Sequence, residues 1–300
     1  MDHSVDIVKR AFGHRSLDRL PRGELWLGTD LFHKVNLEDN LKGHLTLINR
    51  LDQNILCLPI SNNLPINKNL GYRYFNLQEL EDVSMVRDLF LMVLIDGPFQ
   101  RLVEKKGLTK ILTEWKRGKD KIAKEYEKEH VEVDILIKQC LEMSVDAVVI
   151  ADDLAGEGSS FIDPNEIEAF FSHFYTQAVS EIHRRNSYAL FHSCGNIIRL
   201  IPKLVSFGFD GLAAVQHRVN NLISLKEKYG STLTLMAGIE PEMLEIGKIS
   251  SSSLKEYERL IQYFLLRGGL ILSSCSGLYS GEFLERIQKL YRIADELSKE

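Results

Sequence analysis

The chain has 300 residues, of which 44% are hydrophobic and 26% are charged, and its formal net charge at pH 7 is -5. This composition is that of an ordinary globular protein, and without a clustered basic region it argues against nucleic-acid binding. No segment approaches the roughly 18 consecutive apolar residues of a membrane helix. Four cysteines are too few for a disulfide scaffold, and no apolar leader precedes them, so we expect a cytoplasmic protein with reduced thiols.

Short apolar segments alternate with longer segments of helical periodicity along the whole chain. Because strands that alternate with helices pair in parallel, eight such units predict an α/β fold, a single (β/α)8 TIM barrel over residues 1–300. An open doubly wound sheet is the alternative, but its glycine-rich fingerprint is missing. The stretch Phe99–Met143, between the third and fourth predicted strands, is expected to be a helical insert. The predicted strands are Glu24–Leu27, Asn54–Pro59, Phe90–Ile95, Ala147–Ala151, Tyr188–His192, Leu212–Val215, Leu233–Met236 and Leu270–Ser273.

A histidine and two cysteines stand at the predicted ends of two of these strands. His192 and Cys194 follow one apolar run, and Cys275 follows another, 81 residues after Cys194. Residues two apart on a strand share a face, so His192 and Cys194 are expected to point the same way. Three ligands of this kind can hold zinc and leave a fourth position open for chemistry. Core packing is the competing interpretation of the pair, whereas Cys57 and Cys140 lie in apolar patterns and are expected to be buried.

Other polar residues near strand ends are candidates for the same site. Asp152 and Asp153 follow the fourth predicted strand and could take protons or orient a zinc ligand. Capping of a loop or helix is the competing role for both. Asn196 is expected either to cap the following helix or to bind substrate.

Several motifs resemble the uroporphyrinogen decarboxylase superfamily, whose members fold as (β/α)8 barrels. The resemblance covers nearly the whole chain and is densest over residues 145–277. It rests on Arg19-Leu-Pro-Arg-Gly-Glu-Leu-Trp26, Asp96-Gly-Pro98, Ala151-Asp-Asp-Leu-Ala155, Phe191-His-Ser-Cys-Gly-Asn196, Ile201-Pro-Lys-Leu-Val205, Gly208-Phe-Asp-Gly211, Leu225-Lys-Glu-Lys-Tyr-Gly230 and Gly238-Ile-Glu240.

Within that superfamily, a His-x-Cys motif with a distant cysteine is similar to the zinc methyltransferases, including the methylcobamide:coenzyme M enzymes. The resemblance implies zinc on His192, Cys194 and Cys275, a methylated corrinoid as co-substrate, and a small thiol as acceptor. The chain has no D-x-H-x-x-G motif, so a separate corrinoid protein is the implied partner. The methyltransferases often add a glutamate ligand about 20 residues after the His-x-Cys motif, where this chain has Gln216. We expect Gln216 as a fourth ligand, with His217 or Glu240 as alternatives and Glu240 also as a substrate contact. A fourth position without any protein ligand is an equal alternative.

Two other functions stay open at this stage. The true decarboxylases carry an arginine-rich N-terminal motif of the R-Q-A-G-R kind, which is missing here, so decarboxylation of a tetrapyrrole is the weaker enzymatic alternative. A non-catalytic corrinoid- or metal-binding accessory protein is the third. Metal content separates a decarboxylase from the methyltransferase. Turnover with a thiol separates an accessory protein from the methyltransferase.

Overall fold

A computed structural model gives the structure of the chain and describes residues 4–63, 66, 71–84, 88–245, 247 and 249–299. Its centre is a sheet of seven parallel strands in which neighbours in the sequence are neighbours in space. All residues of six strands are buried or nearly so, as expected for a sheet that helices cover. The strands are β1 (Ile55–Pro59), β2 (Phe90–Asp96), β3 (Ala147–Ala151), β4 (Tyr188–His192), β5 (Gly211–Val215), β6 (Thr234–Ile239) and β7 (Leu270–Ser274).

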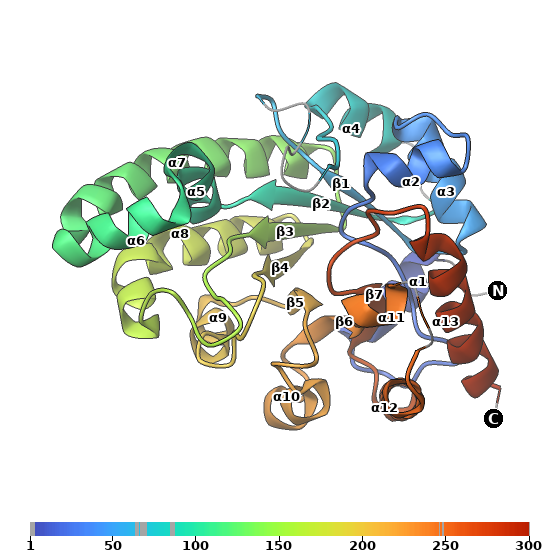
Figure 1. The fold of residues 1–300 in the computed structure, drawn as a ribbon. Helices are drawn as coiled ribbons and strands as arrows, with labels where there is room; N and C mark the ends of the chain where they lie inside the picture. The colour runs from blue at the N-terminus through green and yellow to red at the C-terminus, as the bar shows by residue number, and fades with distance from the viewer. Residues whose placement is uncertain are drawn as a thin grey trace.

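Helices surround the curled sheet on its outside (Figure 1). Among the described residues, none of them is long and apolar enough to cross a membrane. They are α1 (Ser4–Phe12), α2 (Thr29–Lys34), α3 (Leu41–Arg50), α4 (Leu77–Ser84), α5 (Pro98–Lys106), α6 (Leu108–Arg117), α7 (Lys119–Glu142), α8 (Pro164–Arg184), α9 (Ile201–Phe207), α10 (Leu222–Tyr229), α11 (Pro241–Leu244), α12 (Ser251–Arg267) and α13 (Phe283–Leu297).

The region predicted as a helical insert is helical, and it lies between β2 and β3 in the numbering of the structure. Residues 98–142 form α5, α6 and α7, which pack on one another, and α7 also packs on β2. The helical content is therefore observed, while its description as an insert stays a prediction.

The prediction of a regular strand at Glu24–Leu27 is wrong. The chain instead makes isolated bridges there, from Arg22 to Leu272 and from Leu27 to Leu278. The backbone around Arg22 nevertheless joins the two edges of the sheet, since Leu272 N donates to Pro21 O (2.8 Å) and Asn54 N donates to Arg22 O (2.8 Å). The segment therefore links β7 with the start of β1 without forming a full ladder.

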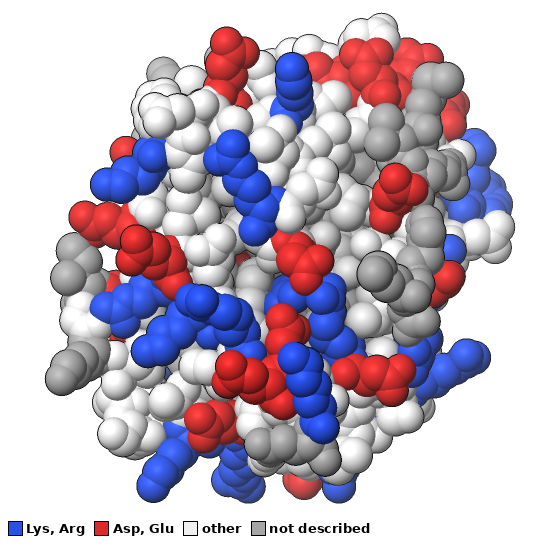
Figure 2. Space-filling view, turned by 90° about the vertical axis from the view of Figure 1, so that its right-hand side faces the viewer, with Lys and Arg blue, Asp and Glu red and all other residues white. Residues whose placement is uncertain are grey.

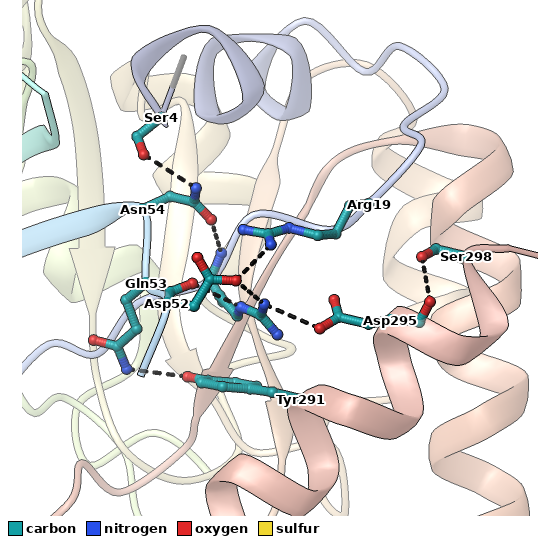
Figure 3. A network of polar contacts seen from close by, with 9 residues as sticks. Ser4, Arg19, Asp52, Gln53, Asn54, Tyr291, Asp295 and Ser298 are labelled. Atoms are coloured by element: carbon teal, nitrogen blue, oxygen red, sulfur yellow. Dashed lines mark hydrogen bonds and ion pairs between the residues drawn. The ribbon is translucent and has the colours of Figure 1, made fainter. Parts of the chain in front are cut away.

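A buried arginine holds this link at the N-terminal end of the sheet (Figure 3). The Arg22 side chain is 3% exposed and forms ion pairs with Asp52 (2.6 Å) and Asp295 (3.1 Å). Its Nε donates to Asp52 O, and its guanidinium lies 4.7 Å from the centre of the Tyr291 ring. Arg19 adds a second ion pair to Asp52 from a side chain that is 31% exposed. Arg22 thus links the N-terminal segment to Asp52, which precedes β1, and to Asp295 of α13.

A buried carboxyl group accepts a hydrogen bond from the Tyr291 hydroxyl. Glu24 is 3% exposed and accepts hydrogen bonds from the backbone and hydroxyl of Ser274 and from the hydroxyl of Tyr291. Burial raises the pKa of Glu24 from 4.5 to about 7, against the opposing effect of these donors. Gln53 donates to the same Tyr291 hydroxyl (3.1 Å), so the carboxyl belongs to a connected polar group.

The raised pKa of Glu24 predicts a pH-dependent stability. Between about pH 4.5 and pH 7 the unfolded chain loses the Glu24 proton while the folded chain keeps it, so the free energy of unfolding falls as pH rises through this range. The gap between the two pKa values corresponds to about 3 kcal/mol. We expect Glu24→Gln to remove this contribution, so that its stability relative to the wild type increases from pH 4.5 to pH 7.5 in urea titrations. The control is Glu132→Gln on the exposed face of α7, and an E24Q difference that does not change with pH would contradict the assignment.

Candidate metal centre

The predicted site residues lie at the carboxyl ends of neighbouring strands, as expected. His192 is the last residue of β4, and Cys275 directly follows β7. Asp152 and Asp153 follow β3, Gln216 follows β5, and Glu240 follows β6. Because the strands are parallel and in sequence order, these positions share one edge of the sheet, where barrels place their active sites.

Three potential metal ligands converge at this edge. In the part of the chain that the structure describes, the group whose donor atoms all lie within 4.8 Å of one another consists of Asp153, His192 and Cys194. The Sγ of Cys194 lies 3.8 Å from His192 Nε2, and an Asp153 oxygen lies 3.7 Å from the same nitrogen. Tetrahedral zinc with ordinary Zn–N and Zn–S distances separates two such donors by about 3.5 Å. The group is therefore close to the geometry that a zinc ion needs.

His192 is oriented so that one ring nitrogen faces this group. Its Nδ1 lies 2.9 Å from the carbonyl oxygen of Ala213, which can only accept a hydrogen bond. Nδ1 therefore carries a proton, which leaves Nε2 as the nitrogen that can bind a metal. The edge of the ring also packs on Trp26, with 5.0 Å between ring centres. The ring is thus held with Nε2 toward Cys194 and Asp153.

Cys194 and Asp153 are connected through the backbone. Cys194 N donates to Asp153 Oδ1 (2.7 Å), and Cys194 is the exposed one of the four free cysteines. Burial of its sulfur, followed by the nearby Asp153 charge, raises the pKa of the Cys194 thiol to about 12. The site therefore disfavours a thiolate unless a cation is present, which is the electrostatic character of a metal site.

Cys275 lies outside the group of three. Its Sγ donates to Val215 O (2.9 Å) and lies 3.4 Å from Glu240 Oε1. Burial, and then the charge of Glu240, holds its pKa well above the usual range. Glu240 in turn accepts a hydrogen bond from His217 N (2.5 Å), so its carboxyl joins the ends of β5, β6 and β7.

Gln216 and Asn196 take part in the loop that carries Cys194. Gln216 Oε1 accepts a hydrogen bond from Gly195 N (2.8 Å). The Asn196 side chain accepts one from Ile198 N (3.3 Å), which is a local turn contact. Each of these oxygens therefore has a backbone partner within the protein.

Asp152 points away from Cys194 and into the layer between sheet and helices. It is fully buried, and its two oxygens accept hydrogen bonds from Gln100 N and Tyr175 OH, both at 2.7 Å. Gly97 leaves room for this carboxyl group, since a Cβ there would lie 2.3 Å from Asp152 Cγ. Burial raises the pKa of Asp152 to about 7. The residue thus binds the first turn of α5, a role that the sequence left open as capping.

The sequence did not predict that a group of aromatic residues with Asp96 lies close to His192. Tyr74 donates to Asp96 at the end of β2 (2.5 Å), and burial raises the pKa of Asp96 to about 7. Tyr72 lies 3.4 Å from Tyr74, hydroxyl to hydroxyl, and its ring packs on Trp26. Only Asp96 carried a usable signal, as a carboxyl group at a strand end, because the aromatic residues come from segments without regular periodicity.

The surface charge agrees with the composition. On the face in Figure 2, Lys and Arg side chains are intermixed with Asp and Glu side chains, mainly over its lower half. Elsewhere on the surface, Arg199 pairs with Asp163 and Lys203 pairs with Glu168, so opposite charges are also mixed there. This view therefore offers no continuous basic area for a nucleic-acid backbone.

Comparisons with known proteins place this geometry in a family. No curated protein sequence matches the chain. A methyltransferase from Methanosarcina mazei has a similar structure, with a TM-score of 0.73 and 17% sequence identity over 98% of each chain. A D-psicose 3-epimerase from Clostridium cellulolyticum is less similar, with a TM-score of 0.53 and 10% identity over 93% of this chain and 98% of that one. At these identities the likeness concerns the fold.

The family model of uroporphyrinogen decarboxylase (URO-D) matches residues 92–297, more than half of the chain. The matched range runs from β2 to the end of α13 and includes the converging ligands on β3 and β4. The chain belongs to the uroporphyrinogen decarboxylase family.

Proposed function

We propose that this protein is a zinc-dependent methyltransferase. It would move a methyl group from a methylated corrinoid, presented by a separate corrinoid protein, to a small thiol such as coenzyme M or homocysteine. The observation that carries the proposal is the convergence of His192 Nε2, Cys194 Sγ and an Asp153 oxygen, with His192 Nδ1 held by a carbonyl. A nitrogen and a sulfur donor at one strand end suit zinc better than the hard cations that prefer oxygen.

The proposed ligands are His192, Cys194 and Cys275, with Gln216 as the candidate for the fourth position. Cys275 must lose its proton and turn from Val215 O to join the other two. Asp153 is the alternative ligand, since its oxygen already lies 3.7 Å from His192 Nε2. Three protein ligands leave the fourth position to the acceptor, whereas Gln216 in that position would have to leave it when the acceptor binds.

Bound zinc would stabilise the thiolate form of the acceptor, the form that attacks carbon. The acceptor sulfur then displaces the corrinoid from the methyl carbon: the carbon–sulfur bond forms as the cobalt–carbon bond breaks, and the electron pair stays on cobalt. The residues of the chain hold the acceptor in line for this displacement and exclude water. Asp153 is placed to take the acceptor's proton when it is not itself a ligand, whereas we give Asp152 a supporting role through α5.

A cavity of about 470 Å³ beside Glu240 is the proposed site for the rest of the acceptor. It lies between the ends of β5 and β6 and α12, and Glu240 joins it to Cys275 (3.4 Å). His217 and Arg218 also line it, so both acidic and basic groups are available to a small polar thiol. Asn196 stands on the neighbouring loop as a further candidate contact.

Membership of the URO-D family and the fold shared with a methyltransferase support the proposal. We further propose that residues 1–300 form one (β/α)8 barrel, in which the segment around Arg22 takes the place of the first strand. Four free cysteines suit a reduced, cytoplasmic setting.

The test is zinc content followed by turnover. We expect protein purified under reducing conditions to hold about one zinc per chain, and we expect it to demethylate methylcobalamin only when a thiol is added. Coenzyme M and homocysteine are the first acceptors, and cobalamin spectra report the reaction. Zinc without turnover on any thiol would favour an accessory metal-binding role. Absence of zinc would overturn the proposal and favour metal-free chemistry of the decarboxylase kind.

A further inference from the structure

Hydrogen bonds from backbone N–H groups fix the loop that carries Cys194. The four consecutive residues 194–197 each donate one, and every acceptor belongs to the segment after β3 or after β5. The pairs are Cys194 N to Asp153 Oδ1 (2.7 Å), Gly195 N to Gln216 Oε1 (2.8 Å), Asn196 N to Gly156 O (2.8 Å) and Ile197 N to Asn220 Oδ1 (3.0 Å).

The Asn220 side chain makes three of the hydrogen bonds in this arrangement. Its side chain is fully buried, although it comes from the segment after β5, far from the loop in sequence. While its Oδ1 accepts from Ile197 N, its Nδ2 donates to Gly195 O (2.8 Å) and to Gln216 O (3.1 Å). One amide therefore binds the backbone on both sides of Asn196, and it also binds the backbone of Gln216, whose side chain accepts from Gly195 N.

The loop has little freedom to find another shape. Gly195 has φ +81°, and a Cβ there would lie 2.4 Å from Gly156 O, so the backbone passes close to the loop after β3. This close approach needs glycine. Hydrogen bonds from the side chains of Gln216 and Asn220, in the segment after β5, hold Gly195 in this position.

We propose that Asn220 is a positioning residue for Cys194: it sets the backbone from which the sulfur reaches His192. This inference rests on the proposed zinc site, because a preset sulfur position has a consequence for metal affinity. Partners that orient the ligands of a metal are worth about 10- to 100-fold in affinity. The Asn220 amide offers a carbonyl acceptor and two N–H donors on one planar group, whereas an ionised carboxylate has no donor and a hydroxyl has one, so neither reproduces the three contacts.

The experiment compares Asn220→Ala and Asn220→Asp with a matched buried asparagine. Asn54 is 5% exposed and binds Arg22 N and Ser4 at the opposite end of the sheet, so Asn54→Ala is the control. We expect N220A to raise the zinc dissociation constant about 10- to 100-fold in chelator competition, with N220D at least as weak because its second oxygen would face two carbonyls. N54A should lose stability yet keep the zinc dissociation constant of the wild type.

Two measurements on metal-free protein keep this test separate from the zinc proposal. Amide exchange at Gly195 and Ile197 should become at least about tenfold faster in both Asn220 variants, because each loses a hydrogen bond that closes the loop. The rate of Cys194 alkylation by iodoacetamide should change as well, and it reports the loop directly because the other three cysteines are buried. If N220A does not fold, N220D carries the test.

The outcomes decide between the two claims. A wild-type protein without zinc would overturn the proposed function, while faster exchange in the variants would still support Asn220 as the residue that sets the loop. A folded Asn220 variant with unchanged exchange at Gly195 and Ile197, or with zinc affinity equal to that of the wild type, would overturn the inference.

Discussion

Replacing Cys194 by alanine is expected to weaken zinc binding at least about 100-fold. The estimate takes one ligand as about a quarter of the free energy with which a four-ligand zinc site binds its metal, or about 3 kcal/mol. The sulfur lies 3.8 Å from His192 Nε2, so its removal takes away one of the two proposed sulfur ligands and leaves Cys275 as the other. Chelator competition measures the affinity, and a weaker sulfur-to-metal charge-transfer band in the cobalt-substituted protein shows that a sulfur ligand has gone.

The matched control is Cys140→Ala. Cys140 is a fully buried cysteine of α7, remote from the strand ends, and its removal creates a small core cavity. C140A should therefore lose some stability and keep full zinc affinity. Equal zinc affinity in C194A and the wild type would show that Cys194 is not a ligand, whatever the activity of the variant.

The second large effect is expected at the opposite end of the sheet. Arg22→Ala should lower the free energy of unfolding by about 1.5–3 kcal/mol, because it removes the buried guanidinium and its charge-assisted hydrogen bonds, while Asp52 itself is 68% exposed and keeps Arg19 as a partner. Asp52 and Asp295 both lie within 3.1 Å of this guanidinium, and the Tyr291 ring packs on it. Urea unfolding followed by circular dichroism measures the change.

Arg19→Ala is the matched comparison, because Arg19 pairs with the same Asp52 carboxyl from a partly exposed side chain. Exposed ion pairs contribute about 0–1 kcal/mol, so R19A should be close to the wild type. Similar losses in R19A and R22A would refute the claim that burial of Arg22 makes its ion pairs important. Zinc affinity should be unchanged in both variants, since neither residue lies near His192.

The arrangement of strands was predictable because it depends on local pattern. Seven of the predicted segments coincide with β1 to β7, since short apolar runs between helical segments specify buried parallel strands. Glu24–Leu27 was predicted wrongly as a strand because it is a short, largely apolar segment like the other seven. Its conformation is decided by distant partners, among them Ser274 and Tyr291 for Glu24 and the Ser276 carbonyl for Trp26.

The candidate site was predictable where one strand supplies both residues. Alternation brought His192 and Cys194 together, and the structure places their donor atoms 3.8 Å apart. Asp153 comes from the neighbouring strand end, so its approach to His192 depends on the register of β3 and β4. Asn220 could not be found in this way, because a buried amide in a loop has no periodic signal and its partners in the loop of Cys194 lie more than 20 residues earlier in the chain.

The ion pair between Arg22 and Asp295 joins residues that are 273 positions apart. A ribosome releases Arg22 long before Asp295, so this contact cannot form until the residues between them have been made. Until then one edge of the growing sheet stays unpaired, and exposed strand edges invite aggregation. Closure also carries the entropy cost of a very long loop, which makes it a late step in folding. Helix α13, which supplies Asp295, thus acts as a timing element for the closure of this sheet.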